Sequence, residues 1–332
     1  MPGKKGKKRV VAIGGGTGLS TILRGLKQYD IDLTAIVTVA DDGGSSGKIR
    51  KDYMIPPPGD IRNVMAALSD VEPLVLEMFQ YRFASSEGLG GHSLGNLMLA
   101  AMTNITGDFS RAVAEMSRIL NIKGRVLPAA NQIITLAAEL EDGSIINGES
   151  KIPVYGHRIR RVFLLPEEVE PLEDAVRAIR KADMIVIGPG SLYTSILPNL
   201  LVPGIGEAVL KSKASRLYIC NIMTQPGETS SFSASDHVRV MYDHLGARFL
   251  NGVVVNDGTG LDAVAEVYRQ QQSVPVQGDV EELGELAEDV ILADIATIVG
   301  GLVRHDAGKV AELICNYLNS PDGAAVCRDG RP

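Results

Sequence analysis

The chain has 332 residues, 45% hydrophobic and 22% charged, which is enough for one large globular core with an elaboration. Its net charge of −7 argues against a nucleic-acid-binding surface, and no apolar run approaches the roughly 20 residues of a membrane-spanning helix. Three cysteines without a Cys-x-x-Cys pair indicate a cytoplasmic protein with neither a disulfide framework nor a zinc site.

Residues 1–9 are basic, and we expect them to form a disordered tail, because only four apolar residues follow and a secretory signal needs more. Those four residues, 10–13, predict a buried strand. A glycine turn comes next, and apolar residues at helical spacing predict a helix from Leu19 to Tyr29.

The glycine turn has the spacing Gly-x-Gly-x-Gly over residues 14–18. It lacks the last glycine of a dinucleotide site, where Leu19 stands, and this disfavours a nicotinamide dehydrogenase. Glycines let the backbone approach an anion, and a helix start offers free N–H groups. The alternative is an ordinary tight turn; the functional interpretation predicts phosphate or nucleotide binding by Gly15, Gly16, Thr17 and Gly18.

A second β-branched strand is predicted over residues 33–40, which completes a strand–helix–strand unit. A loop rich in Asp, Gly and Ser follows at its carboxyl end, where open α/β sheets bind ligands. An acid here could bind a ribose hydroxyl, two acids could hold Mg²⁺, or the loop could be a solvated turn. The candidate site residues are Asp41, Asp42, Gly43, Ser45 and Ser46.

The stiff segment 55–60 leads into a helix that we expect Asp60 to cap. Arg62 lies in its first turn, where a cation is unfavourable, so we expect an anionic partner: a ligand phosphate, Asp41 or Asp42. Residues 91–95 match Gly-x-Ser-x-Gly, but no strand precedes them, which argues against a hydrolase. Ser93 is instead a predicted helix cap beside Asn96, a candidate anion contact, and His92 is a candidate site-lining residue.

A helix is predicted over residues 108–121, and strands over 132–140 and 159–165. Asp142-Gly143 is a hairpin signal between them. We therefore expect a small antiparallel β insertion at about residues 130–166, between two α/β halves.

The second half repeats the first, with a buried strand over 183–187 that runs into a glycine-containing loop and a helix. The phosphate-binding candidates in this loop are Gly188, Gly190, Ser191, Thr194 and Ser195. Further strands are predicted over 216–220, 252–256 and 289–292, and Arg304-His305-Asp306 should open the final helix.

These elements predict a Rossmann-like, doubly wound α/β fold with a mostly parallel sheet. Residues 10–320 should form one large domain, and residues 321–332 a frayed tail. The loops should meet at one sheet edge, with Gly16, Asp42, Asn96 and Ser191 around one hollow. The five histidines have no zinc-binding spacing.

Taken together, six motifs resemble the gluconeogenesis factor (UPF0052) family, which is related to 2-phospho-L-lactate transferases. They are IGGGTG at 13–18, ADDGGSSG at 40–47, PPGDIRN at 57–63, GHSLGN at 91–96, GPGSLYTS at 188–195 and NIMTQPGE at 221–228.

The resemblance implies a cytoplasmic protein that binds a UDP-sugar such as UDP-N-acetylglucosamine. It also implies a requirement for normal cell shape and wall synthesis during growth on gluconeogenic carbon sources. The sugar-nucleotide candidates are Asn221, Thr224, Tyr268 and Arg304. Tyr268 could stack on a ring and Arg304 bind a diphosphate; the alternatives are a helix-face aromatic and a solvent ion pair.

No nucleophile or general base is singled out by pattern, which favours a ligand-binding regulator that requires no cofactor. The resemblance implies that its unknown protein partner belongs to wall metabolism. The alternative is a Mg²⁺-dependent phosphoryl-group transferase, with Asp41 and Asp42 holding the metal and Arg62 neutralising phosphate charge. The DDGGSSG segment resembles the gluconeogenesis branch and argues against transferase activity. A homodimer is expected only from the general frequency of such assemblies.

Overall fold

The main sheet has seven parallel strands in the order β10-β9-β8-β7-β1-β2-β3. The computed structural model describes residues 6–84, 88–156, 158–261 and 265–320. The predicted tail 321–332 lies outside these residues, as do residues 1–5 of the N-terminal tail and His157. The strands are β1 (Arg9–Gly14), β2 (Asp32–Val37), β3 (Arg125–Pro128), β7 (Met184–Ile187), β8 (Ser215–Ile219), β9 (Gly252–Asn256) and β10 (Asp289–Ala293).

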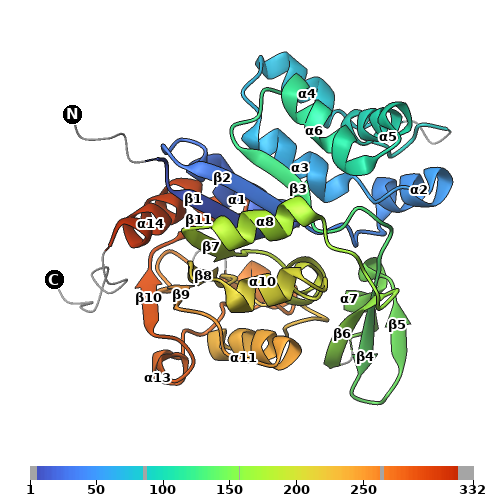
Figure 1. The fold of residues 1–332 in the computed structure, drawn as a ribbon. Coiled ribbons are helices and arrows are strands. Elements are labelled where there is room, and N and C mark those ends of the chain that lie inside the picture. The colour runs from blue at the N-terminus through green and yellow to red at the C-terminus, as the bar shows by residue number, and fades with distance from the viewer. Residues whose placement is uncertain (1–5, 85–87, 157, 262–264, 321–332) are drawn as a thin grey trace, which may run out of the picture.

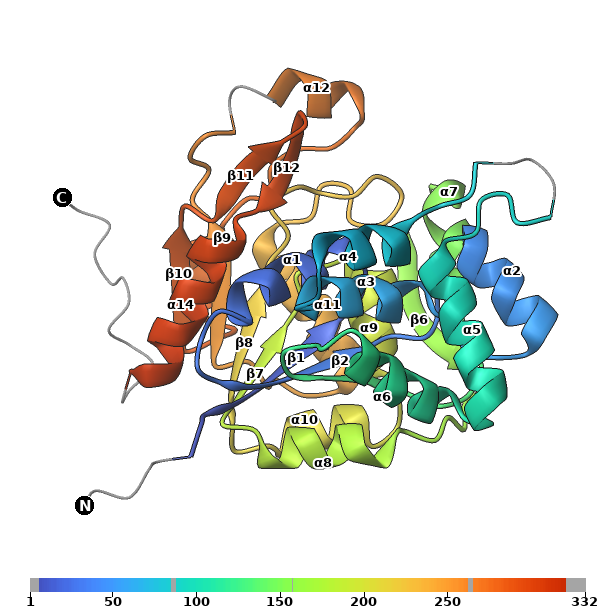
Figure 2. The same cartoon turned by 90° about the horizontal axis from the view of Figure 1, so that it is seen from above.

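Helices cover both faces of this sheet, so its central strands are almost wholly buried (Figures 1 and 2). One face carries α1 (Gly16–Leu26), α3 (Gly59–Leu68) and α14 (Ala307–Asn319); the other carries α8 (Glu173–Lys181), α10 (Ile205–Lys211) and α11 (Ala234–Leu245). Helices α1 and α14 pack very closely, because a Cβ on Gly25 would lie 2.0 Å from the Ala307 carbonyl oxygen. This arrangement confirms the predicted Rossmann-like α/β class.

The antiparallel insertion is also confirmed. Strands β4 (Thr135–Leu140), β5 (Ile145–Asn147) and β6 (Ile159–Leu165) form a separate sheet in the order β5-β4-β6. The Asp142-Gly143 turn joins β4 to β5, with Gly143 in the left-handed region at φ +83°. After β5, a 3₁₀ turn (Glu149–Lys151) and the short α7 (Ile152–Tyr155) follow, and they bring the insertion toward the main domain.

Several elements differ from the sequence prediction. The loop after β2 gives way to a helix at Gly44, so α2 (Gly44–Tyr53) replaces most of the predicted turn; β2 itself ends at Val37. The final helix begins at Ala307, and Arg304 and His305 belong to β12 (Leu302–His305), paired with β11 (Ala296–Val299). Asp306 caps the helix by accepting from the Gly308 and Lys309 amides. Ser93 caps its helix as predicted.

The remaining elements complete the layers around the sheet. They are α4 (Pro73–Gln80), α5 (Leu94–Thr106), α6 (Phe109–Ile119), a π-helical segment (Leu192–Ile196), α9 (Leu197–Leu200), α12 (Ala265–Gln270) and α13 (Val280–Gly284). None of the helices in the described ranges is long and apolar enough to cross a membrane.

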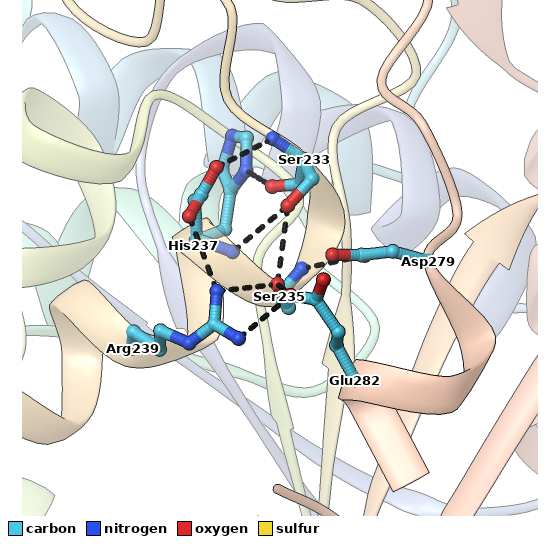
Figure 3. A network of polar contacts seen from close by, with 7 residues as sticks. Ser233, Ser235, His237, Arg239, Asp279 and Glu282 are labelled. Carbon is cyan, nitrogen blue, oxygen red and sulfur yellow. Dashed lines mark hydrogen bonds and ion pairs between the residues drawn. The ribbon is translucent and has the colours of Figure 1, made fainter. Parts of the chain in front are cut away.

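A polar network fixes the start of α11 against α13 (Figure 3). Ser233 and Asp236 form a reciprocal capping box, and the Ser235 amide donates to Asp279 at 3.0 Å. Arg239 donates to Glu282 at 2.7 Å and to the Ser235 hydroxyl at 2.8 Å. The network therefore anchors the C-terminal end of the 221–233 segment, which begins at the carboxyl end of β8.

Candidate functional site

The strand order reverses at the boundary between β1 and β7. From β1 the chain winds through β2 to β3, whereas from β7 it winds through β8 and β9 to β10. Ile13 pairs with Ile187, so the glycine turns after these two strands leave the sheet side by side. Ligands of open α/β sheets bind at such a switch point, beyond the carboxyl ends of the strands.

The two turns are in backbone contact. A Cβ on Gly18 would lie 2.5 Å from the Pro189 carbonyl oxygen, and a Cβ on Gly190 would lie 3.5 Å from the Gly15 carbonyl oxygen. The Asn199 amide links them by donating to the Gly14 carbonyl at 3.0 Å and the Ser195 carbonyl at 2.8 Å. At position 18 only glycine allows so close an approach to the second turn, and the backbone of both turns lies against one cavity.

This cavity has a volume of about 520 Å³. The predicted residues that line it are Gly15, Gly16, Thr17, Gly18, Gly190, Ser191, Ser195, Asn221, Thr224, Tyr268 and Arg304. The structure therefore brings predicted residues from both halves of the chain together at one cavity. The insertion contributes Pro153, against whose carbonyl oxygen Gly227 packs.

The remaining predicted residues are not among those that line this cavity: Gly188, Thr194, Asp41, Asp42, Gly43, Ser45, Ser46, Arg62, His92 and Asn96. Thr194 is buried behind Ser191, to whose hydroxyl it donates at 2.7 Å. The expected hollow shared by Gly16, Asp42, Asn96 and Ser191 is thus found for Gly16 and Ser191 only.

The acidic loop after β2 is engaged with the protein itself. The Asp41 carboxylate accepts from the Gly43 amide at 2.9 Å, and the Asp42 carboxylate accepts from the Ser150 amide of the insertion at 2.8 Å. A Cβ on Gly59 would lie 2.7 Å from Asp41 Oδ2, so α3 begins directly against this loop. The two acids therefore join α2, α3 and the insertion beside the cavity.

A buried polar chain lies between α2 and α5. The Asn96 amide donates to the Ser45 hydroxyl at 3.0 Å, and that hydroxyl is 3.1 Å from His92 Nδ1. Arg62 is buried on α3 and donates to Asn63 at 2.6 Å. Burial and the charge of Arg82 lower its pKa, and the charges of Asp60 and Asp41 oppose that shift. Of the two acids expected as partners of Arg62, Asp41 acts on its charge, and so does Asp60, which the sequence did not predict as a partner.

The prediction that Asp60 caps α3 is wrong. Pro58 occupies the cap position and no side chain caps the helix. The Asp60 carboxylate is instead directed at the first glycine turn, where it interacts with the Gly16 backbone amide. A Cβ on Gly15 would lie 2.5 Å from Asp60 Oδ2. A tertiary contact, which local sequence cannot reveal, therefore replaces the local one.

At the second turn, the Ser191 hydroxyl donates to the Glu228 carboxylate, which also lines the cavity. Burial raises the pKa of Glu228 above its usual value, and the Ser191 hydrogen bond opposes that shift. Glu228 is the last residue of the NIMTQPGE motif and is not among the site residues predicted from sequence. The sequence signal that could have identified Glu228 is that it is the one carboxylate in the loop of residues 221–228, which follows a predicted buried strand.

The sugar-nucleotide candidates divide into two kinds. Asn221 holds the second turn, donating to the Gly190 carbonyl at 2.8 Å and accepting from the Gly190 amide at 3.2 Å. Thr224 binds Val274 through both its backbone amide and its hydroxyl. These two residues shape the cavity wall, and their polar atoms are largely used within the protein.

Tyr268 and Arg304 come from the lobe of α12 and β12. The Tyr268 hydroxyl accepts from the Val303 amide at 2.7 Å and its side chain is buried, which fixes the ring at the cavity wall. Arg304 is exposed, and no ion pair joins it to an acidic residue in the described parts of the chain. Its guanidinium donates to the Val303 carbonyl at 3.3 Å. The solvent ion pair that we considered as its alternative role is not present among these residues.

Two carboxyl groups beside the first turn have raised pKa values. Burial raises the pKa of Asp60 to about 7, helped by the charge of Asp41, and raises that of Glu149 to about 9, helped by Asp60. Above the ordinary carboxyl pKa values, Asp60 and Glu149 therefore keep protons in the folded protein that they have already lost in the unfolded chain. This contribution to stability is complete below those values and declines as pH rises toward 9.

We expect the thermal unfolding midpoint to fall by roughly 5 °C or more between pH 6 and pH 9, measured by calorimetry. Glu149→Gln should remove much of this pH dependence, because glutamine cannot ionise. If the unfolding midpoint of the variant falls with pH as steeply as that of the parent protein, the pH dependence does not come from Glu149.

Among the described residues, no group of three or more His, Cys, Asp or Glu side chains is arranged to hold a metal ion. Mg²⁺ takes most of its ligands from substrate phosphates and water. For the transferase alternative, Asp41 or Asp42 would have to act together with phosphates of the ligand.

Comparison with known proteins identifies the relatives of this chain. A family model described as 2-phospho-L-lactate transferase CofD matches residues 10–296. The gluconeogenesis factor of Bacillus subtilis (strain 168) is 57% identical over 94% of this chain and 98% of that protein. The gluconeogenesis factor of Listeria monocytogenes is 50% identical over 95% and 97%. A crystal structure of a UPF0052 family member from Bacillus halodurans has a TM-score of 0.91 at 54% identity, covering 93% of this chain and 99% of that one.

Proposed function

Because this chain belongs to the gluconeogenesis factor family, we propose that its switch-point cavity binds a UDP-sugar such as UDP-N-acetylglucosamine. The diphosphate lies on the backbone of the two glycine turns, and Arg304 neutralises part of its charge. Tyr268 offers a ring face to the uracil or the sugar.

The observation that carries this proposal is the composition of the cavity. Its volume of about 520 Å³ falls within the range of roughly 300–1,000 Å³ typical of small-molecule sites. One side is glycine backbone at the start of α1, and the other holds an aromatic ring and an arginine without a described acidic partner. Backbone amides and a cation suit a diphosphate, whereas a buried ring suits a planar or pyranose group.

The proposed role is regulatory. Ligand occupancy would favour one of two conformations and so alter a surface read by a cytoplasmic partner in wall metabolism, which requires only different ligand affinities in the two states. We propose that this signal is required for normal cell shape and wall synthesis on gluconeogenic carbon sources. A homodimer would double the partner surface without changing the site.

A Mg²⁺-dependent phosphoryl-group transferase is the second candidate, favoured by the family model described as a 2-phospho-L-lactate transferase. In this alternative Asp41 or Asp42 would hold a metal ion that supplies Lewis-acid stabilisation of phosphate charge, and Arg62 would offset charge on the leaving phosphate. The two candidates differ in whether the ligand is consumed.

The test is calorimetry with UDP-N-acetylglucosamine, with and without Mg²⁺, followed by analysis of the nucleotide after prolonged incubation. Binding with the nucleotide recovered intact supports the regulator. Metal-dependent conversion of the ligand supports the transferase. Absence of nucleotide binding under both conditions would reject both candidates.

A further inference from the structure

We propose that Asp60 and Glu228 act as internal substitutes for ligand phosphates, each placed against one glycine turn, and that an entering diphosphate has to displace them. The two residues would thus keep the turns in position while limiting ligand affinity. This inference rests on the proposed function and concerns the control of the same site.

Asp60 takes the anion position at the start of α1. This helix has 11 residues, and its first turn carries no acidic side chain of its own. A helix start attracts negative charge through its free N–H groups and its dipole. Asp60 reaches it from α3 and interacts with the Gly16 amide, packed against Gly15. A phosphate on the same amide would compete with this carboxylate.

Glu228 takes the equivalent position on the second turn. The Ser191 hydroxyl donates its single proton to Glu228 Oε2. The Ser191 hydroxyl oxygen also accepts from the Thr194 amide at 3.2 Å and from the Thr194 hydroxyl at 2.7 Å. Ser191 therefore has no proton left for a phosphate oxygen. A ligand that uses this hydroxyl has to release Glu228 first.

Glu149 of the insertion is affected by both carboxylates. Burial raises its pKa to about 9, and the negative charges of Asp60 and Glu228 add to this shift. Burial already disfavours the ionised forms of Asp60, Glu149 and Glu228 around the two turns. Adding a diphosphate brings further like charge, so loss of either carboxylate charge should favour the ligand.

A purely structural role and the proposed role as phosphate substitutes predict opposite effects on ligand affinity when the charge of Asp60 or Glu228 is removed. Asp60→Asn and Glu228→Gln each keep an acceptor oxygen for the turn and remove only the negative charge. At about pH 8, above the Asp60 pKa of about 7, calorimetry without divalent cations, with pyrophosphate and with UDP-N-acetylglucosamine as separate probes, should show each variant binding on the order of tenfold more tightly. Glu77→Gln, an exposed carboxylate on α4, is the matched control and should leave both affinities unchanged.

Unchanged or weaker binding of both probes in both variants, with thermal unfolding like that of the parent protein, would overturn the inference. Two independent variants guard against one that misfolds. Tighter pyrophosphate binding without any response to the UDP-sugar would support this inference and reject the proposed ligand. Absence of binding of either probe to the parent protein and to all variants would overturn both.

Discussion

Replacing Gly18 with alanine is expected to weaken UDP-N-acetylglucosamine binding on the order of 100-fold. The added Cβ would lie 2.5 Å from the Pro189 carbonyl oxygen and 2.9 Å from its carbonyl carbon. Both are backbone atoms, so no rotamer change relieves the overlap and the two turns have to separate. Since the turns together form the proposed phosphate cradle, calorimetry on the folded variant should detect the loss.

The control is Gly284→Ala at the end of α13, where a Cβ would meet no atom within 4 Å. It makes the same chemical change and should leave affinity unaltered. If Gly18→Ala binds the UDP-sugar as tightly as the parent protein does, contact between the turns is not needed for the ligand.

Arg304→Ala is expected to weaken UDP-N-acetylglucosamine binding about tenfold or more, because a charge-assisted contact to the diphosphate is lost. The effect should shrink as salt is raised, since Arg304 is exposed and screening weakens its attraction. Arg304→Lys should recover only part of the affinity, because an ammonium group cannot make a bidentate contact. Titrations at two salt concentrations measure all three effects.

Arg269→Ala provides the comparison for this series. Arg269 is exposed on α12 and paired with Glu266 at 2.5 Å, outside the cavity lining. Its loss should leave the affinity within about twofold of the parent value. An Arg304→Ala affinity equal to that of Arg269→Ala would remove Arg304 from the site.

The parts of the fold predicted correctly are those with strong local signals. Buried parallel strands are continuous β-branched runs, and glycine turns directly follow two of them, over residues 14–18 and 188–190. The rule that ligands bind at the carboxyl edge then brings these turns together without coordinates. The Asp142-Gly143 hairpin was predictable for a similar reason, because its turn chemistry is local.

The elements predicted incorrectly depend on tertiary contacts. Edge strand β3 is only four residues long, and its pairing with β2 supplies what its own sequence does not. The sequence predicts Arg304 at a helix start because Asp306, two residues later, caps α14. In the structure Arg304 pairs with Thr297 and so belongs to the β11–β12 hairpin. Asp60 follows the pattern of a cap but is used by another helix.

The candidate site shows the same division. Sequence correctly predicted that the loops after β1, β7 and β8 surround the cavity, but it wrongly added the loop after β2 and the loop before α5, and it did not show which side chains the protein already uses to hold the cavity. Asn221 and Thr224 are engaged with neighbouring backbone, and only coordinates reveal this. The separation of the Ser45–Asn96 chain from the cavity likewise depends on the placement of α2, a helix whose Gly- and Ser-rich start resembles a turn.

The most direct test of the central claim is a crystal structure of the protein grown with UDP-N-acetylglucosamine. The account predicts the diphosphate at the switch point between β1 and β7, with its oxygens on the backbone of residues 15–18 and the second turn, and Arg304 alongside. Density for the nucleotide at another surface, with both glycine turns free of phosphate, would contradict it.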